Sequence, residues 1–189
     1  ICEIQFSGFA FQCFHQIENH CARYRMRSQS RFHIPMVIRM PYGGGVRALE
    51  HHSESEEQFY AHIPGLKMVI PSGPRNARAL LAAAIRDPDP VIFFEAKSLY
   101  HAAKEEVPDE SEVMPIGRAQ VAREGNALTL IAYGAMVRVA LEAADVRAGR
   151  RTPPPTETNF ACAWLTGTLD ACEAAAVAYA AAVVAVATG

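Results

Sequence analysis

Short apolar segments alternate with helical patterns over the first 108 residues, and this alternation limits the fold more than any other feature. Most of the predicted strands are apolar at nearly every position, so they need cover on both faces. A parallel sheet with helices in its crossover connections provides that cover. The predicted strands are residues 1–6, 35–40, 66–70 and 91–94, and the predicted helices are residues 9–26, 53–62 and 74–86. The sequence therefore predicts an α/β fold, a parallel sheet flanked by helices.

The remainder of the chain divides into three parts. Residues 109–117 are polar and interrupted by prolines, which is typical of a linker. Residues 118–146 start a second α/β domain, with strands at 119–123 and 127–133 and a helix from about residue 135. Residues 147–189 form an atypical tail rich in proline and alanine. Its apolar run at 174–187 is shorter than the ~18–20 residues that a membrane span needs, so we expect a poorly packed helix or disorder there.

Charge and cysteine content narrow the classes of function. The net charge is −2, so no basic field predicts binding to nucleic acid or to a membrane. The five cysteines form no C-x-x-C pair, and we interpret them as buried or free thiols in a reducing compartment. The chain starts at Ile1, inside a predicted strand and without a signal segment, so we expect the first domain to be incomplete.

The first candidate site follows the strand at residues 1–6. There the chain turns through Ser7 and Gly8 into a helix. Ligands of open α/β sheets lie at the carboxyl ends of the strands, so Gln5 and Phe9 are expected to face a crevice. An amide can hydrogen-bond a heterocycle and a phenyl ring can stack on one, although a core phenylalanine beside a sheet-edge glutamine explains the same spacing.

A glycine triplet and a histidine pair form the second candidate site. Residues 43–45 are all glycine, but the Lys-Ser/Thr pair that closes a phosphate loop is absent. His52 directly precedes Ser53, which we predict to open a helix as part of a capping box with Glu56. The positive end of that helix would disfavour imidazolium, and a neutral imidazole suits proton transfer. Only one of His51 and His52 is expected to reach the site, and a surface loop with two solvated histidines is the alternative.

The third candidate site is the helix end before residues 87–90, which read Asp-Pro-Asp-Pro. Ala84, Asp87 and Asp89 would direct several oxygens toward one point there. Such a place can hold a monovalent cation, and a tight turn without a ligand is the alternative.

Several motifs together resemble one family. They are E-I-Q-F-S-G-F, M-P-Y-G-G-G-V-R-A-L-E-H-H-S-E-S, P-G-L-K-M-V-I-P-S, D-P-D-P-V-I-F-F-E and A-Y-G-A-M-V, in order over residues 1–146. The run is similar to the β subunits of thiamine-diphosphate-dependent 2-oxo acid dehydrogenases, the decarboxylating components of the pyruvate and branched-chain complexes. The resemblance implies that residues 1–108 are the later part of a transketolase-like pyrimidine-binding domain and that residues 118–146 open the carboxy-terminal transketolase domain.

The resemblance also implies roles for the candidate residues. Gln5 and Phe9 match positions that contact the aminopyrimidine of thiamine diphosphate, and His52 matches a histidine implicated in acyl transfer to the lipoyl arm. Ala84, Asp87 and Asp89 match positions around a structural potassium ion in some members. The family's catalytic glutamate would lie upstream of residue 1. Mg²⁺ and the diphosphate are held by the α subunit through a G-D-G motif, which this chain lacks.

The resemblance implies a pyruvate dehydrogenase β-subunit fragment that is inactive alone and located in the bacterial cytoplasm, or in the mitochondrial matrix of a eukaryote. Its expected partners are the α subunit, in a heterotetramer, and the lipoyl acyltransferase core. The alternatives are a branched-chain 2-oxo acid dehydrogenase, a transketolase or deoxyxylulose-phosphate synthase, or a truncated interaction module without activity. Residues 147–189 are unlike the family and carry no functional inference.

Overall fold

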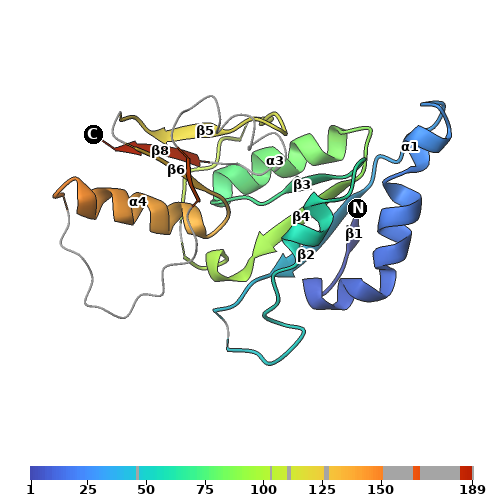
Figure 1. Cartoon of the computed structure of the whole chain (residues 1–189), viewed down its shortest axis with the longest axis horizontal. Coiled ribbons are helices and arrows are strands. Elements are labelled where there is room, and N and C mark those ends of the chain that lie inside the picture. The colour runs from blue at the N-terminus through green and yellow to red at the C-terminus, as the bar shows by residue number, and fades with distance from the viewer. Residues whose placement is uncertain are drawn as a thin grey trace.

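The fold contains two sheets side by side (Figure 1). The computed structural model describes residues 1–45, 47–102, 104–109, 112–125 and 128–150, with the backbone of residues 164–166 and 184–188. Within these residues no helix is long and apolar enough to cross a membrane.

The first sheet is wholly parallel, as the apolar segments predict. Its strand order is β1-β2-β4-β3, and Ile38 pairs with Ile92 across the centre. The strands are β1 (Cys2–Glu3), β2 (Val37–Tyr42), β3 (Lys67–Val69) and β4 (Val91–Ala96). β2 continues through Pro41, where we had predicted its end. The Arg39 carbonyl accepts a hydrogen bond from the Ile4 amide, so the backbone of Arg39 faces β1. Pro41 faces the same side two residues later. Because β1 has ended there, the missing N–H of proline leaves no strand hydrogen bond unmade.

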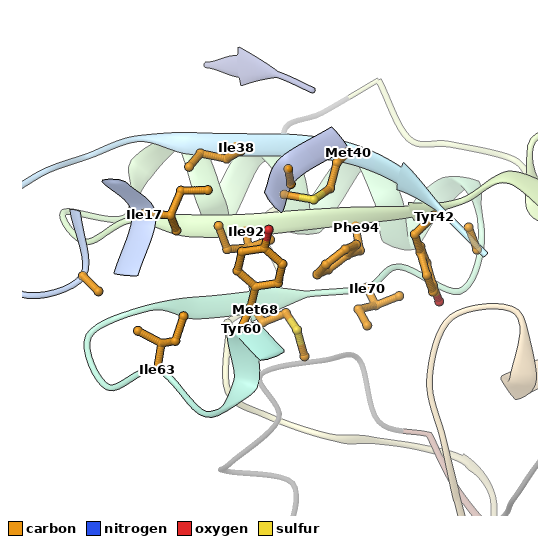
Figure 2. Packing of buried hydrophobic residues seen from close by; sticks show 13 residues of the cluster. Ile17, Ile38, Met40, Tyr42, Tyr60, Ile63, Met68, Ile70, Ile92 and Phe94 are labelled. Atoms are coloured by element: carbon orange, nitrogen blue, oxygen red, sulfur yellow. The ribbon is translucent and has the colours of Figure 1, made fainter. Parts of the chain in front are cut away.

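Successive residues of each strand point to opposite faces, which gives the sheet two apolar layers. Figure 2 shows one layer, where Met40, Ile92 and Phe94 surround the ring of Tyr60. The other layer holds Val91 and Phe93, packed against Leu80 and Ala84. The prediction of helices on both faces is therefore confirmed.

Helix α3 (Pro74–Arg86) covers the second layer and starts with Pro74 at its first position, as predicted. Ala79, Leu80 and Ala84 are its buried residues. The linker predicted at residues 109–117 packs on this helix. Arg75 pairs with Glu112 at 2.8 Å, and Met114 joins the apolar layer.

The predicted helix at residues 9–26 is instead three short segments. These are a 3₁₀ helix η1 (Ser7–Cys13), a π-helical segment η2 (Gln16–Cys21) and α1 (Tyr24–Arg27). The amide of Ala22 donates to the carbonyl of Ile17, five residues back. Residues five apart lie about 140° apart on a regular α-helix. The wider π turn brings both onto the sheet, where Ile17 is 3% and Ala22 5% exposed.

The second sheet includes two strands from the tail. Its order is β5-β8-β6-β7, with β8 parallel to β5 and antiparallel to β6. The elements are β5 (Gln120–Arg123), β6 (Leu128–Ala132), α4 (Met136–Arg147), β7 (Trp164–Thr166) and β8 (Val184–Thr188). The prediction of helix or disorder is wrong for residues 184–187. Val184, Val186 and Thr188 alternate there, and β-branched residues favour a strand. The rest of the apolar run lies outside the described residues.

The turn between β6 and α4 packs on the first sheet. Gly134 has φ of +54°, and a Cβ there would lie 2.7 Å from the Tyr42 hydroxyl and 2.9 Å from Ile70. Tyr133 donates its hydroxyl to Glu57 at 3.2 Å. The Ala-Tyr-Gly motif therefore requires glycine for both its backbone conformation and the close approach.

Candidate functional site

The candidate site lies at the carboxyl edge of the first sheet, which is the side where the carboxyl ends of its parallel strands lie. Phe6 and Phe9 follow β1, His51 and His52 lie in the loop after β2, and Lys97 follows β4. Crossovers of a parallel sheet bring these strand ends to one edge, where α/β proteins bind ligands. The edge thus combines aromatic rings, imidazoles and one cation.

Four rings are packed together at this edge. The ring centroid of Phe9 lies 5.7 Å from that of His51 in a stacked arrangement and 5.6 Å from that of His52, edge-on. Phe6 lies 4.5 Å from His52 and 6.2 Å from Phe9. The expectation that only one histidine reaches the site is wrong, because His51 adopts φ of +68° and the left-handed turn brings both rings to Phe9.

Small residues permit this packing. Gly8 lies against the loop, and a Cβ there would lie 2.7 Å from the carbonyl oxygen of His51. Gly43 has φ of +82°, and its amide donates to the Glu54 carbonyl at 2.7 Å. The glycines on both sides of the cluster are therefore required for its geometry.

His52 is positioned by a backbone carbonyl and not by a helix end. Helix α2 (Glu57–Ala61) starts later than predicted and has no side-chain cap. Ser53 donates its hydroxyl to Ala48 at 3.0 Å instead, so the predicted capping box is wrong. His52 Nδ1 lies 2.9 Å from the Glu50 carbonyl. A carbonyl only accepts, so Nδ1 carries a hydrogen, and in the neutral ring the lone pair is on Nε2.

Gln5 and Phe9 differ in exposure. Gln5 is exposed at the end of β1, whereas Phe9 is half-buried within the ring cluster. An exposed amide and a partly open phenyl ring fit a flat nitrogen heterocycle such as an aminopyrimidine. Their role in cofactor binding stays a prediction.

The predicted cation site lies at the opposite end of the sheet. Asp87 accepts from the Lys67 ammonium at 2.7 and 2.8 Å, and Asp89 accepts from Arg25 at 2.8 Å. The amide of Asp87 donates to the carbonyl of Ala84 at 3.3 Å. A cavity of about 770 Å³ adjoins Arg25, Lys67 and Asp89. A potassium ion here would share its carboxylates with two protein cations, and no group of three metal-ligating side chains occurs among the described residues.

Two buried charged residues at the carboxyl edge were missed by the sequence reasoning. Lys97 is 8% exposed and Glu56 is 5% exposed. Lys97 is the first cation after an apolar strand, at the edge where ligands bind, and this position could have identified it. Glu56 was assigned to a capping box. Burial raises the pKa of Glu56 to about 7, the Ser7 hydroxyl opposes this shift, and Glu54 adds to it.

Glu56→Gln is expected to remove a pH dependence of stability. Because the folded-state pKa lies above the ordinary value of 4.5, Glu56 favours the folded state most below that pH and loses this contribution as the pH rises through about 7. The free energy of unfolding of Glu56→Gln, relative to that of the unmodified chain, should increase from pH 5 to pH 7.5. Urea unfolding across this range measures the difference.

The matched control is Glu50→Gln, at an exposed position in the preceding loop. Its difference from the unmodified chain should stay flat with pH. An equally flat profile for Glu56→Gln would show that the Glu56 carboxyl is ionised without cost.

Comparison with known proteins defines the class. Residues 1–102 match the family model for the transketolase pyrimidine-binding domain, so the chain belongs to this family. Within it, the chain is 53% identical over 138 residues to the pyruvate dehydrogenase E1 component subunit beta of Acholeplasma laidlawii, covering 73% of this chain and 42% of that protein.

Two further relatives match the chain over a similar length. The subunit of the same name from Mycoplasma genitalium is 53% identical over 134 residues, covering 71% of this chain and 41% of the relative. The 2-oxoisovalerate dehydrogenase subunit beta of Bacillus subtilis is 48% identical over 145 residues, covering 77% and 44%. The chain spans about two fifths of the length of these curated relatives.

Proposed function

We propose that this chain is part of the β subunit of a pyruvate-decarboxylating 2-oxo acid dehydrogenase component, which transfers the acyl group to a lipoyl arm. The observation that carries the proposal is the convergence of Phe9 and His52 at the carboxyl edge of a pyrimidine-binding domain. Both residues match family positions. The named relatives at 53% identity favour pyruvate.

In this proposal thiamine diphosphate binds between this chain and an α subunit. Gln5 would hydrogen-bond the aminopyrimidine and Phe9 would pack on its face, because an exposed amide and a half-buried ring suit these roles. The bound cofactor supplies the electron sink for loss of carbon dioxide. The diphosphate and Mg²⁺ would lie on the α subunit, since this chain has no G-D-G motif.

His52 would move a proton at Nε2 during acyl transfer. Its Nδ1 is held at 2.9 Å from the Glu50 carbonyl, which orients the ring and, in the neutral form, places the lone pair on Nε2. Phe6 and Phe9 pack against the ring and hold it in place. Acylation of the lipoyl arm opens its disulfide, so that one sulfur takes the acyl group and the other leaves as a thiolate. An imidazole at this position could take up a proton at Nε2 and pass it to that thiolate.

The wider assembly is part of the same proposal. The partners are an α subunit, in a heterotetramer, and the lipoyl acyltransferase core, and the location is the cytoplasm of a bacterium. A potassium ion would be a further ligand, at Ala84, Asp87 and Asp89. The alternative is a branched-chain substrate, favoured by the near-equal identity to the 2-oxoisovalerate and pyruvate subunits of Bacillus subtilis, 48% and 47%.

A chimera tests the function. Residues 1–102 would replace the matching segment of the Acholeplasma laidlawii subunit, which would then be assembled with its own α subunit. We expect the chimera to reduce an artificial electron acceptor with pyruvate, and kcat/KM for pyruvate to exceed that for 3-methyl-2-oxobutanoate by about 10- to 100-fold. The reverse preference would establish the branched-chain alternative. A correctly assembled chimera that turns over neither acid would refute the proposal.

A further inference from the structure

Lys97 is buried in a way that the packing of the fold does not explain. It is 8% exposed, and its ammonium has no hydrogen-bond partner among the described residues. Burying an unpaired ammonium is costly, and burial lowers the pKa of Lys97, with Glu56 acting in the opposite direction. A structural lysine would be expected to have a partner.

Lys67 provides that comparison within the same chain. Its ammonium contacts Asp87 at 2.7 and 2.8 Å and Asp89 at 3.3 Å. Where the fold holds a partly buried lysine for structure, it therefore supplies carboxylates. At Lys97 none of the described residues supplies a carboxylate at contact distance, although the packing excludes water from the ammonium.

The surroundings of Lys97 belong to the candidate site. The residue opens the turn η3 (Lys97–Leu99), directly after β4. Its Nζ lies 4.8 Å from the ring centroid of Phe6, and the same ring lies 4.5 Å from that of His52. A cation over a phenyl ring gains some stabilisation, but less than a hydrogen-bonded anion provides. The ring of Phe6 therefore contacts both the Lys97 ammonium and the imidazole of His52, the predicted base.

The charges of Lys97 and Glu56 indicate which kind of anion could bind beside them. Glu56 is the neighbouring acid, and its carboxyl oxygens are also buried without a hydrogen bond of normal geometry. A single ammonium beside a carboxyl group can neutralise one negative charge. A multiply charged phosphate would be repelled by Glu56 and would need several donors, so a monovalent carboxylate fits better.

We propose that Lys97 is an anion-binding residue of this site, whose ammonium receives the carboxylate of the 2-oxo acid beside Phe6 and His52. The identity of the acid rests on the function proposed above, whereas the preference for a small carboxylate rests on Lys97 and Glu56. The ammonium is covered in the structure, so the acid must displace side chains to reach it. Once bound, the carboxylate supplies the partner that the fold omits.

The full 189-residue chain allows a direct test because it contains three lysines, Lys67, Lys97 and Lys104. In a chain labelled with ¹³C at lysine Cε, the Lys97 signal should shift in a saturable way with pyruvate and with acetate. Acetone, which lacks the carboxylate, should leave it unmoved. The signals of Lys67 and Lys104 should stay constant and serve as internal references.

Lys97→Met keeps a flexible apolar side chain and removes the charge. Pyruvate binding, followed through the line widths of the ligand, should weaken by about 10- to 100-fold, the usual effect of losing a charged hydrogen bond. Lys67→Met, at the opposite end of the sheet, should bind pyruvate normally. Lys97→Met should also unfold at a higher urea concentration than the unmodified chain, because an unpaired buried charge is removed. A purely structural lysine would give the opposite shift.

Several results would overturn the inference. They are the absence of saturable pyruvate binding to the unmodified chain, equal pyruvate affinity of Lys97→Met, or stronger binding of inorganic pyrophosphate with the same dependence on Lys97. In the chimera, Lys97→Met should raise KM for pyruvate more than it lowers kcat. If the chimera is active and its KM for pyruvate is unchanged by Lys97→Met, the role proposed for Lys97 is refuted but the proposed function is not. An inactive chimera with Lys97-dependent acetate binding would refute the proposed function alone.

Discussion

His52→Ala, introduced into the assembled chimera, is expected to slow acyl transfer to a lipoyl domain by about 100- to 1000-fold, the range typical of losing a positioned base. Decarboxylation measured with an artificial electron acceptor should fall less than about 10-fold, because the acceptor replaces the lipoyl disulfide in that reaction. The reason is the position of His52, whose Nε2 is left as the base by the contact of Nδ1 with Glu50. Lipoyl acylation and acceptor reduction, measured on the same preparation, give the two rates.

His51→Ala is the matched control because His51 also packs on Phe9. Its side chain is 56% exposed, and it lies 3.8 Å from Glu54. We expect both reactions to change by less than about 10-fold. Equal losses in both assays for His52→Ala would assign that residue a structural role, and a larger loss of transfer in His51→Ala would exchange the roles of the two histidines.

Phe94→Ala is expected to destabilise the chain by about 3–5 kcal/mol, the usual cost of removing a buried phenyl ring. Phe94 is 0% exposed at the centre of β4. Its ring packs edge-on against Tyr42 at 5.3 Å and Tyr60 at 5.6 Å (Figure 2). The variant leaves a cavity between the sheet and α2, and urea unfolding gives the change in free energy.

Phe32→Ala tests whether burial is the cause. Phe32 is 58% exposed and touches only one ring among the described aromatic contacts, that of Tyr24 at 6.1 Å. Its loss should cost less than about 1 kcal/mol. A similar cost for both variants would mean that the layer around Phe94 is not the stabilising core of the first sheet.

The sequence was most informative where the signal is local. The apolar strands and Pro74 at the start of α3 predict the parallel sheet and one of its covering helices, because the periodicity of a strand or helix can be recognised from residues close together in the chain. The prediction of one regular helix at residues 9–26 was wrong, because a π turn between Ile17 and Ala22 places both residues on the sheet. That placement is required by the sheet and not by the segment itself.

The candidate site shows the same division. Its location at the carboxyl edge, with Phe9 and His52, follows from the strand ends, and the family motifs add the roles proposed for them. The sequence did not indicate that both histidines pack on Phe9, because that depends on the left-handed turn at His51. It also gave no sign that the capping box would be replaced by a bond from Ser53 to Ala48.

By itself the sequence determined the α/β class, the parallel pairing of the first sheet and the edge at which we propose that a ligand binds. Only the tertiary structure decided which side chains meet there. Phe6 and Lys97 are far apart in the sequence and touch because three crossovers, from β1 to β2, from β2 to β3 and from β3 to β4, return the chain to the same edge. The burial of an unpaired ammonium is likewise a property of the packed molecule, since in the unfolded chain water surrounds every lysine and distinguishes none of them.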